Sequence, residues 1–251
     1  ETNGCGEFLA SDMMKYVDNA RVLGLGETMR FMECCEGEKR MADKLELFAK
    51  KHIDGHAPGI RGKEVQAYRL AGVENDHECS TAEEVLDKLR AGLHIYVREG
   101  SGAKNLETLI KTMLDAGVCL DRCAFCTDDK HVEEIRKEGH ISTCIRKAIA
   151  LGVPVAKAYK MGSYQAAEFY GLKNYGAIGA GYRADIVFLD DLEQVRPLDV
   201  MKDGRILTEE DYAKDYSVPV PDELLHTVHV GEVTKEKIRL SCDGKTDVIQ
   251  M

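Results

Sequence analysis

Five short apolar runs alternate with longer amphipathic stretches over the first two thirds of the chain, and this alternation constrains the fold more than any other feature. The runs have the length of strands and end in glycine or polar residues, whereas the stretches between them have helical periodicity. Such alternation predicts βα units around a parallel sheet. We expect the strands at residues 21–27, 52–58, 72–78, 93–100 and 122–129.

The amphipathic stretches predict the helices. The clearest start belongs to the helix after the third run, where Ser80 or Thr81 can cap the first turn and Glu83 or Glu84 lies within it. The expected helices cover residues at about 41–51, 62–72, 80–92, 105–117, 131–138, 141–151 and 155–171.

A polar residue that can take part in chemistry stands at the end of each predicted strand: Glu27, His56, His77, Glu99 and Asp128. In a (β/α)8 barrel the carboxyl ends of the strands form the mouth of the active site. An open flavodoxin-like sheet binds ligands mainly at one switch point. Five strands are compatible with either fold, but polar residues at all five ends favour an α/β fold of the TIM-like barrel type. Since such a barrel has eight βα units, we expect a partial barrel with about five of them.

The sequence changes character near residue 174. Glycine turns and β-branched runs replace the long helical stretches. Three later segments alternate like strands: HTVHVGE (226–232), EKIRLSC (236–242) and TDVIQM (246–251). We therefore expect two domains, with residues 1–174 forming the C-terminal part of a (β/α) barrel and residues 175–251 forming a small β-rich companion domain.

Charge and cysteine content narrow the class of protein. A formal net charge of -10, without a long Lys/Arg run, argues against a nucleic-acid partner. The sequence contains no apolar stretch that is long enough to predict a membrane span. Nine cysteines without the spacing of a disulfide scaffold favour a reducing, cytoplasmic setting. A zinc site at Cys119, Cys123 and Cys126 is the alternative, but no nearby histidine or second pair completes four ligands, so buried thiols are favoured.

His56 and His77 end successive predicted strands, so a barrel would place them side by side on its rim. Neutral imidazole is a common ligand of zinc, iron and manganese, and the pair predicts a metal site. The alternative is two ordinary histidines in loops. Asp54 and Asp76 precede them and are either structural or orient the imidazoles. The remaining histidines are expected to be structural, among them His226, except for two that stay undecided, His131 and His140.

Three further stretches carry candidate site residues. Glu27 follows glycines that permit close approach of the backbone, or it is an acid at a helix N-terminus. Asp128, with an aspartate beside it, can bind a metal or take a proton from an attacking water, or it can cap a helix. The loop that contains Arg98, Ser101 and Lys104 is either a ligand-binding loop or a solvated one.

Taken together, these stretches resemble one known family. GLGETMRF, IDGHAPGIRGKEVQAYRLAGVENDHECST, VREGSGAKNL, CTDDKH and KMGSYQAAEFYGLKNYGAIGAGYRADIVFLDDL are similar, in that order, to the prokaryotic adenine deaminases of the metal-dependent amidohydrolases. The last stretch is typical of amidohydrolases in general, at the point where the chain leaves the barrel. DGHAPG, DHE and REGS with KNL indicate the adenine branch.

The resemblance implies a binuclear metal site, usually of manganese or iron with zinc as an alternative, that converts adenine and water to hypoxanthine and ammonia in purine salvage. It implies that Glu27 bridges the metals, that His56 and His77 bind one of them, and that Asp128 is both a metal ligand and a proton shuttle. Glu99 is expected to contact the substrate or transfer a proton. Arg98 and Ser101 are expected to contact adenine. The implied assembly is a homo-oligomer.

The chain departs from the family in one respect. The family has a His-x-His pair on the first barrel strand, and this sequence has none. We therefore expect a central fragment with half of the ligands, inactive or nearly so by itself, whose unpaired strand edges favour association. Two other functions stay open: an amidohydrolase for another cyclic amidine or amide, and a non-catalytic half-barrel that binds a partner.

Overall fold

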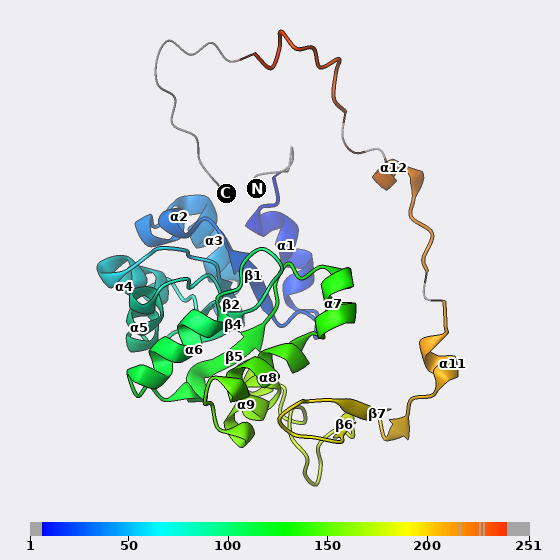
Figure 1. Cartoon of the computed structure of the whole chain (residues 1–251). Helices are drawn as coiled ribbons and strands as arrows, with labels where there is room; N and C mark the ends of the chain where they lie inside the picture. Colours follow the sequence, from blue (N-terminus) through cyan, green and yellow to red (C-terminus); the bar gives the residue numbers. More distant parts are fainter. Residues whose placement is uncertain (1–6, 216, 226, 228, 240–251) are drawn as a thin grey trace. The chain divides into compact units, whose positions relative to one another are not determined.

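The computed structural model describes residues 7–215, 217–225, 227 and 229–239. The chain divides into two compact units, Glu1–Leu207 and Thr208–Met251. The first contains the strands and the candidate site (Figure 1).

Five parallel strands run in chain order through the first unit. Their bounds are β1 (Gly24–Thr28), β2 (His52–Gly55), β3 (Asn75–Asp76), β4 (His94–Arg98) and β5 (Cys123–Cys126). Strand β1 pairs with β2, and β3, β4 and β5 pair in sequence. One backbone hydrogen bond, from Glu74 N–H to the Ile53 carbonyl (3.0 Å), connects β2 with the start of β3. The carboxyl ends of all five strands therefore point to the same edge.

The helices alternate with these strands as the sequence predicts. Helices α2 to α6 follow one another along the outside of the strands (Figure 1). None of the helices in the described ranges is long and apolar enough to cross a membrane. The bounds are α1 (Ala10–Val17), α2 (Phe31–Glu36), α3 (Lys39–Leu47), α4 (Gly62–Leu70), α5 (Ala82–Arg90), α6 (Leu106–Asp115), η1 (Leu120–Arg122), α7 (Val132–Glu138), α8 (Ile141–Ala150), α9 (Val155–Gly162) and α10 (Tyr164–Phe169).

Apolar side chains on the outer face of the strands hold the helices. Ile53 of β2 belongs to one buried cluster with side chains of α2, α3 and α4. Ile95 and Val97 of β4 belong to a second cluster with side chains of α5, α6, α8 and α9. Since residues alternate between the two faces of a strand, this packing leaves His52, Asp54, His94 and Tyr96 for the inner face. The fold thus separates an apolar outer layer from a polar and aromatic inner one.

A local sequence signal accounts for the start of α5. The Thr81 side chain caps α5 by accepting a hydrogen bond from the backbone N–H of Glu84, and the Glu84 carboxylate accepts one from the backbone N–H of Thr81. This capping box confirms the predicted start of the helix. The prediction of a single helix at 155–171 is wrong, because this segment forms two helices, α9 and α10. The break falls at Ser163, whose hydroxyl donates to the carbonyl of Tyr159 (2.9 Å), a bond that competes with helical geometry. Helices α1 and α2 were not predicted.

Helix α10 packs its C-terminal aromatic residues on the inner face of the strands. The Phe169 ring lies 5.0 Å from that of His52, 4.5 Å from that of His94 and 5.9 Å from that of Tyr96, measured between centroids. His52 and His94 begin β2 and β4. The amino ends of the strands are therefore packed by aromatic rings, and the carboxyl ends are left for other groups.

The region after residue 174 differs in part from its prediction. A small antiparallel sheet forms from β6 (Ile186–Leu189), β7 (Pro197–Lys202) and β8 (Arg205–Ile206) within the first unit. The described residues of 208–239 contain the short helices α11 (Glu209–Tyr212) and α12 (Asp222–Leu225), and those at 227, 229–232 and 236–239 form no strand; the rest of the strands expected at 226–232 and 236–242 lies outside the described residues. His226 and TDVIQM lie outside the described residues. The division at 174/175 stays a prediction.

The close approach of β2 and β3 depends on the absence of a side chain at Gly55. A Cβ at this position would collide with the backbone oxygen of Asn75 and with Val73, whereas one at Gly26 of β1 would meet nothing within 4 Å. We expect Gly55→Ala to lower the free energy of unfolding by about 1–3 kcal/mol, because the strands must separate. We expect Gly26→Ala to change it by less than about 0.5 kcal/mol. Urea denaturation of both variants measures this, and equal effects would contradict the packing described.

Candidate metal centre

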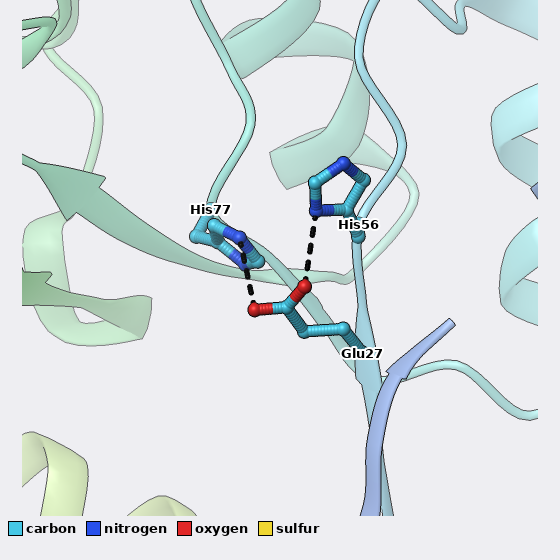
Figure 2. Close-up of side chains that lie close together, drawn as sticks. All are labelled: Glu27, His56 and His77. Carbon is cyan, nitrogen blue, oxygen red and sulfur yellow. Dashed lines mark ion pairs between the residues drawn. The ribbon is translucent and has the colours of Figure 1, made fainter. Parts of the chain in front are cut away.

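Three side chains from successive strands converge at the carboxyl edge. Glu27 lies in β1, His56 directly follows β2, and His77 directly follows β3. The His56 Nδ1 is 3.4 Å from Glu27 Oε2, and the His77 Nε2 is 3.7 Å from Glu27 Oε1. Figure 2 shows the carboxylate facing both rings, one oxygen toward each. The structure thus brings together three of the predicted metal ligands.

An irregularity in β1 accompanies the orientation of Glu27. Leu25 pairs with Ile53, and the next pair is Thr28 with Gly55, so β1 contains one residue more than β2 over this interval. Such a bulge bends a strand locally and redirects its side chains. Glu27 lies within this interval, next to the end of the strand.

Glu78 is a fourth member of the site, and the sequence analysis missed it. One oxygen of its carboxylate lies 3.3 Å from His77 Nε2 and 3.7 Å from His56 Nδ1. The same oxygen is ion-paired with the guanidinium of Arg98. The sequence signal for Glu78 was its position directly after His77. That position does not fix the direction of its side chain, because successive residues of a loop have no regular orientation.

Hydrogen bonds and neighbouring charges shift the pKa values of Glu78 and His77. The hydrogen bond to His77, together with the contact and charge of Arg98, lowers the pKa of Glu78 to about 2 against the opposing effect of burial. Burial lowers the pKa of His77, but the hydrogen bond to Glu78 and the negative charges of Glu27 and Asp76 outweigh it, so this pKa lies above 6.5. Glu78 is therefore ionised throughout the physiological range.

The donors fit a divalent cation. The Nδ1 atom of His56 is buried and has no hydrogen-bond partner among the described residues, although a carboxylate lies beside it. Buried polar atoms are rarely left unpaired, and a nitrogen in this position suits a metal ligand. Imidazole and carboxylate together suit zinc, manganese or iron. Glu27, His56 and His77 have one ligand atom each within 4.8 Å of the others.

Asp128 joins the group through a second set of contacts. Its backbone is left-handed (φ 47°) two residues after the end of β5, and its carboxylate lies 2.9 Å from Arg98 Nη1. Asp128, His77 and Glu78 also form a group with ligand atoms within 4.8 Å of one another. Arg98 is thereby ion-paired with both Glu78 and Asp128. Of the residues predicted to contact the substrate, Arg98 alone makes a described contact with these groups.

Glu99 and Ser101 engage other partners. The buried carboxylate of Glu99 accepts a hydrogen bond from Lys147 of α8 (2.5 Å), and the Ser101 hydroxyl donates to Glu134 of α7 (2.6 Å). Glu99 belongs to neither group of potential metal ligands in the described residues. Successive residues of a strand point to opposite faces, so Arg98 and Glu99 cannot both face the site from β4. Their roles in binding adenine stay predictions.

Asp54 and Asp76 do not bond the imidazole rings. Asp76, fully buried, accepts hydrogen bonds from the backbone N–H groups of Ala57 (2.8 Å) and Glu78 (3.0 Å) and from Lys88 Nζ (2.8 Å). The Asp76 carboxylate therefore joins the backbone of the loop that carries His56 to the backbone of the loop that carries His77. Asp54 accepts a hydrogen bond from the Tyr170 hydroxyl (2.9 Å).

The cysteines of β5 are free thiols. Cys123 is buried, which raises its pKa to about 12, and burial also raises the pKa of Cys126. Potential metal-binding groups among the described residues include no cysteine. Of the three cysteines considered as a zinc site, Cys123 is buried, Cys126 is half-buried and Cys119 is exposed, so the expectation of buried thiols holds for Cys123 and is wrong for Cys119.

Sequence comparison relates the chain to metal-dependent hydrolases. The model of the amidohydrolase family matches residues 34–207. An adenine deaminase of Desulfitobacterium hafniense (strain Y51) is 41% identical over 252 residues, which cover 100% of this chain and 44% of that protein. An adenine deaminase of Clostridium acetobutylicum is also 41% identical, over 99% of this chain and 43% of that protein. The chain thus spans less than half the length of these relatives.

Structural comparison agrees at the level of the fold. A β-aspartyl dipeptidase of Fervidobacterium islandicum AW-1 superposes with a TM-score of 0.60 at 17% identity, covering 82% of this chain and 63% of that one. The predicted α/β fold with an incomplete set of parallel βα units is confirmed, and the described strands form no closed barrel.

We expect the purified chain to bind Mn²⁺ or Zn²⁺ through Glu27, His56 and His77. His56→Ala and His77→Ala should each weaken binding by at least roughly 100-fold, because loss of a ligand itself costs no less than loss of a ligand's outer partner, which costs about 10–100-fold. The affinity should also fall as the pH is lowered through the raised pKa of His77, since the metal competes with the proton. Isothermal titration calorimetry at several pH values measures both.

His131→Ala provides the matched control, because this exposed histidine starts α7 and belongs to neither potential ligand group in the described residues. Its metal affinity should equal that of the parent chain. Equal weakening by all three substitutions would contradict the assignment.

The buried pair of Lys88 and Asp76 should matter more for stability than any surface pair. Lys88→Met leaves a buried carboxylate without its counter-charge, and we expect a loss of about 3–5 kcal/mol in the free energy of unfolding. Lys39→Met breaks an exposed pair with Asp43 and should cost less than about 1 kcal/mol. Urea denaturation compares the two variants, and similar losses would refute the prediction.

Proposed function

The chain belongs to the amidohydrolase family, and on that basis we propose that its metal centre serves the hydrolytic deamination of adenine to hypoxanthine and ammonia. Relatives that are 41% identical over the whole chain bear the name adenine deaminase. The observation that carries the proposal is the convergence of Glu27, His56 and His77 on one point at the carboxyl edge of the strands.

In this proposal Glu27, His56 and His77 hold a divalent metal, manganese or iron with zinc as the alternative. A bound metal supplies Lewis acidity, which makes water a better nucleophile at neutral pH. The ligand types support such a metal, because histidine and carboxylate together suit all three ions. The family site is binuclear, and Asp128 and Glu78 are the remaining carboxylates beside His77.

Asp128 would act as the proton shuttle. Its carboxylate takes a proton from the attacking water and delivers it to the exocyclic amine, so that adenine and water give hypoxanthine and ammonia. Arg98 supports this role, since its guanidinium contacts Asp128 at 2.9 Å and orients the carboxylate. Glu99 and Ser101 remain proposed substrate contacts, although each needs to leave its present partner.

We place the reaction in purine salvage in the cytoplasm, by a homo-oligomer. The free thiols of the described residues support a reducing compartment. Adenine itself, rather than a nucleic acid or a membrane, is the proposed partner.

The test replaces the matching 44% of the Desulfitobacterium hafniense adenine deaminase with this chain and measures ammonia release from adenine with Mn²⁺. We expect the chimera to be active and His77→Ala to lower its kcat/KM by at least about 100-fold. The chain alone should release little ammonia, because its sequence has no His-x-His pair.

A chimera that unfolds cooperatively and binds Mn²⁺, yet hydrolyses a cyclic amide instead of adenine, would identify another amidohydrolase. A folded chimera without metal binding or turnover would favour the non-catalytic half-barrel. His131→Ala again serves as the control, with unchanged activity expected.

A further inference from the structure

We propose that Tyr68 is a positioning residue whose hydroxyl fixes the distance between Glu27 and His56. Tyr68 lies on α4, outside the strands, and nothing in its sequence context indicates a link to the site. The inference rests on the proposed metal centre and adds to it a residue that sets the geometry of two ligands.

The hydroxyl of Tyr68 joins the backbone at both ligands. It donates a hydrogen bond to the carbonyl of Thr28 (2.9 Å), the residue after Glu27. It accepts one from the backbone N–H of His56 (3.0 Å). A single oxygen atom therefore connects the end of β1 with the first residue after β2.

This connection lies where the strand pairing stops. Strand β2 ends at Gly55, and the last pair of the ladder is Thr28 with Gly55, after the bulge that contains Glu27. Beyond that pair the backbone N–H of His56 has no strand partner in the described ladder. The Tyr68 hydroxyl takes the place of the next ladder bond, and it does so between the two segments that carry ligands.

Tyr68 is itself held rigidly. Its side chain is completely buried in the cluster that contains Ile53 and Val65. A tyrosine has few rotatable bonds, and one enclosed on all sides transmits the position of α4 to both strand ends.

The test compares Tyr68→Phe with Tyr159→Phe. The hydroxyl of Tyr159 donates to the carbonyl of Leu192 (2.8 Å), so this control also removes a hydrogen bond to the backbone, but at α9. Both variants are titrated with Co²⁺, whose visible absorption reports the geometry of its ligands. We expect Tyr68→Phe to weaken Co²⁺ binding by roughly 10–100-fold, as removal of an outer partner does, and to change the spectrum. Tyr159→Phe should leave both unchanged.

The outcomes separate this inference from the metal centre. If the unsubstituted chain binds no Co²⁺, the centre itself is wrong. If it binds Co²⁺ and Tyr68→Phe binds equally well with the same spectrum, the positioning role is overturned, whatever the loss of stability.

A measurement on the unsubstituted chain covers the case in which Tyr68→Phe does not fold. Positioning requires the bond to exist before the metal arrives. We therefore expect the His56 amide of the metal-free chain to exchange with solvent as slowly as the amides of β2. Exchange as fast as that of an open loop would overturn the inference.

Discussion

The buried ion pair between Asp76 and Lys88 determines how the loops at the carboxyl edge are arranged. Both side chains are completely buried, and removal of either charge from water costs several kcal/mol unless all of its bonds are made. They are made here by backbone groups. Lys88 donates to the carbonyl of Ala57 (2.6 Å), and Asp76 accepts from the N–H groups of Ala57 and Glu78. Because the pair is satisfied only in this arrangement, the residues after His56 and His77 have one favourable conformation.

The charges at the site favour a cation, because three carboxylates lie close together there. The carboxylates of Glu27, Glu78 and Asp128 are balanced by the single guanidinium of Arg98 and by any charge on the imidazole rings. Like charges at such distances repel one another, more strongly where water is partly excluded. A divalent cation relieves this repulsion, and it also supplies a partner for the Nδ1 atom of His56.

The sequence allowed prediction of the strands and of the site residues that depend on their order. Glu27, His56 and His77 end successive parallel strands, so their proximity follows from topology alone. Glu99, which follows Arg98 at the end of β4, has its carboxylate bonded to Lys147, whereas Arg98 reaches the site. Tyr68 and Lys88 could not be identified, since each contacts residues 31 to 40 positions away in the chain. Such contacts depend on the packing of helices on strands, which local sequence patterns do not specify.

The amino ends of the strands contribute aromatic packing, and the carboxyl ends carry the candidate metal site. At the amino end, the rings of Phe169, His52 and His94 fill the inner face, and burial lowers the pKa of His94 to about 4, so that this ring stays neutral. At the carboxyl end, the imidazole rings keep partners that raise the pKa of His77, and one nitrogen stays without a hydrogen bond. The same residue type is thus a packing group at one end and a potential ligand at the other. His52 at the amino end has its Nδ1 hydrogen-bonded to Glu74 (2.7 Å), whereas the buried Nδ1 of His56 at the carboxyl end has no hydrogen-bond partner among the described residues and is open to a metal.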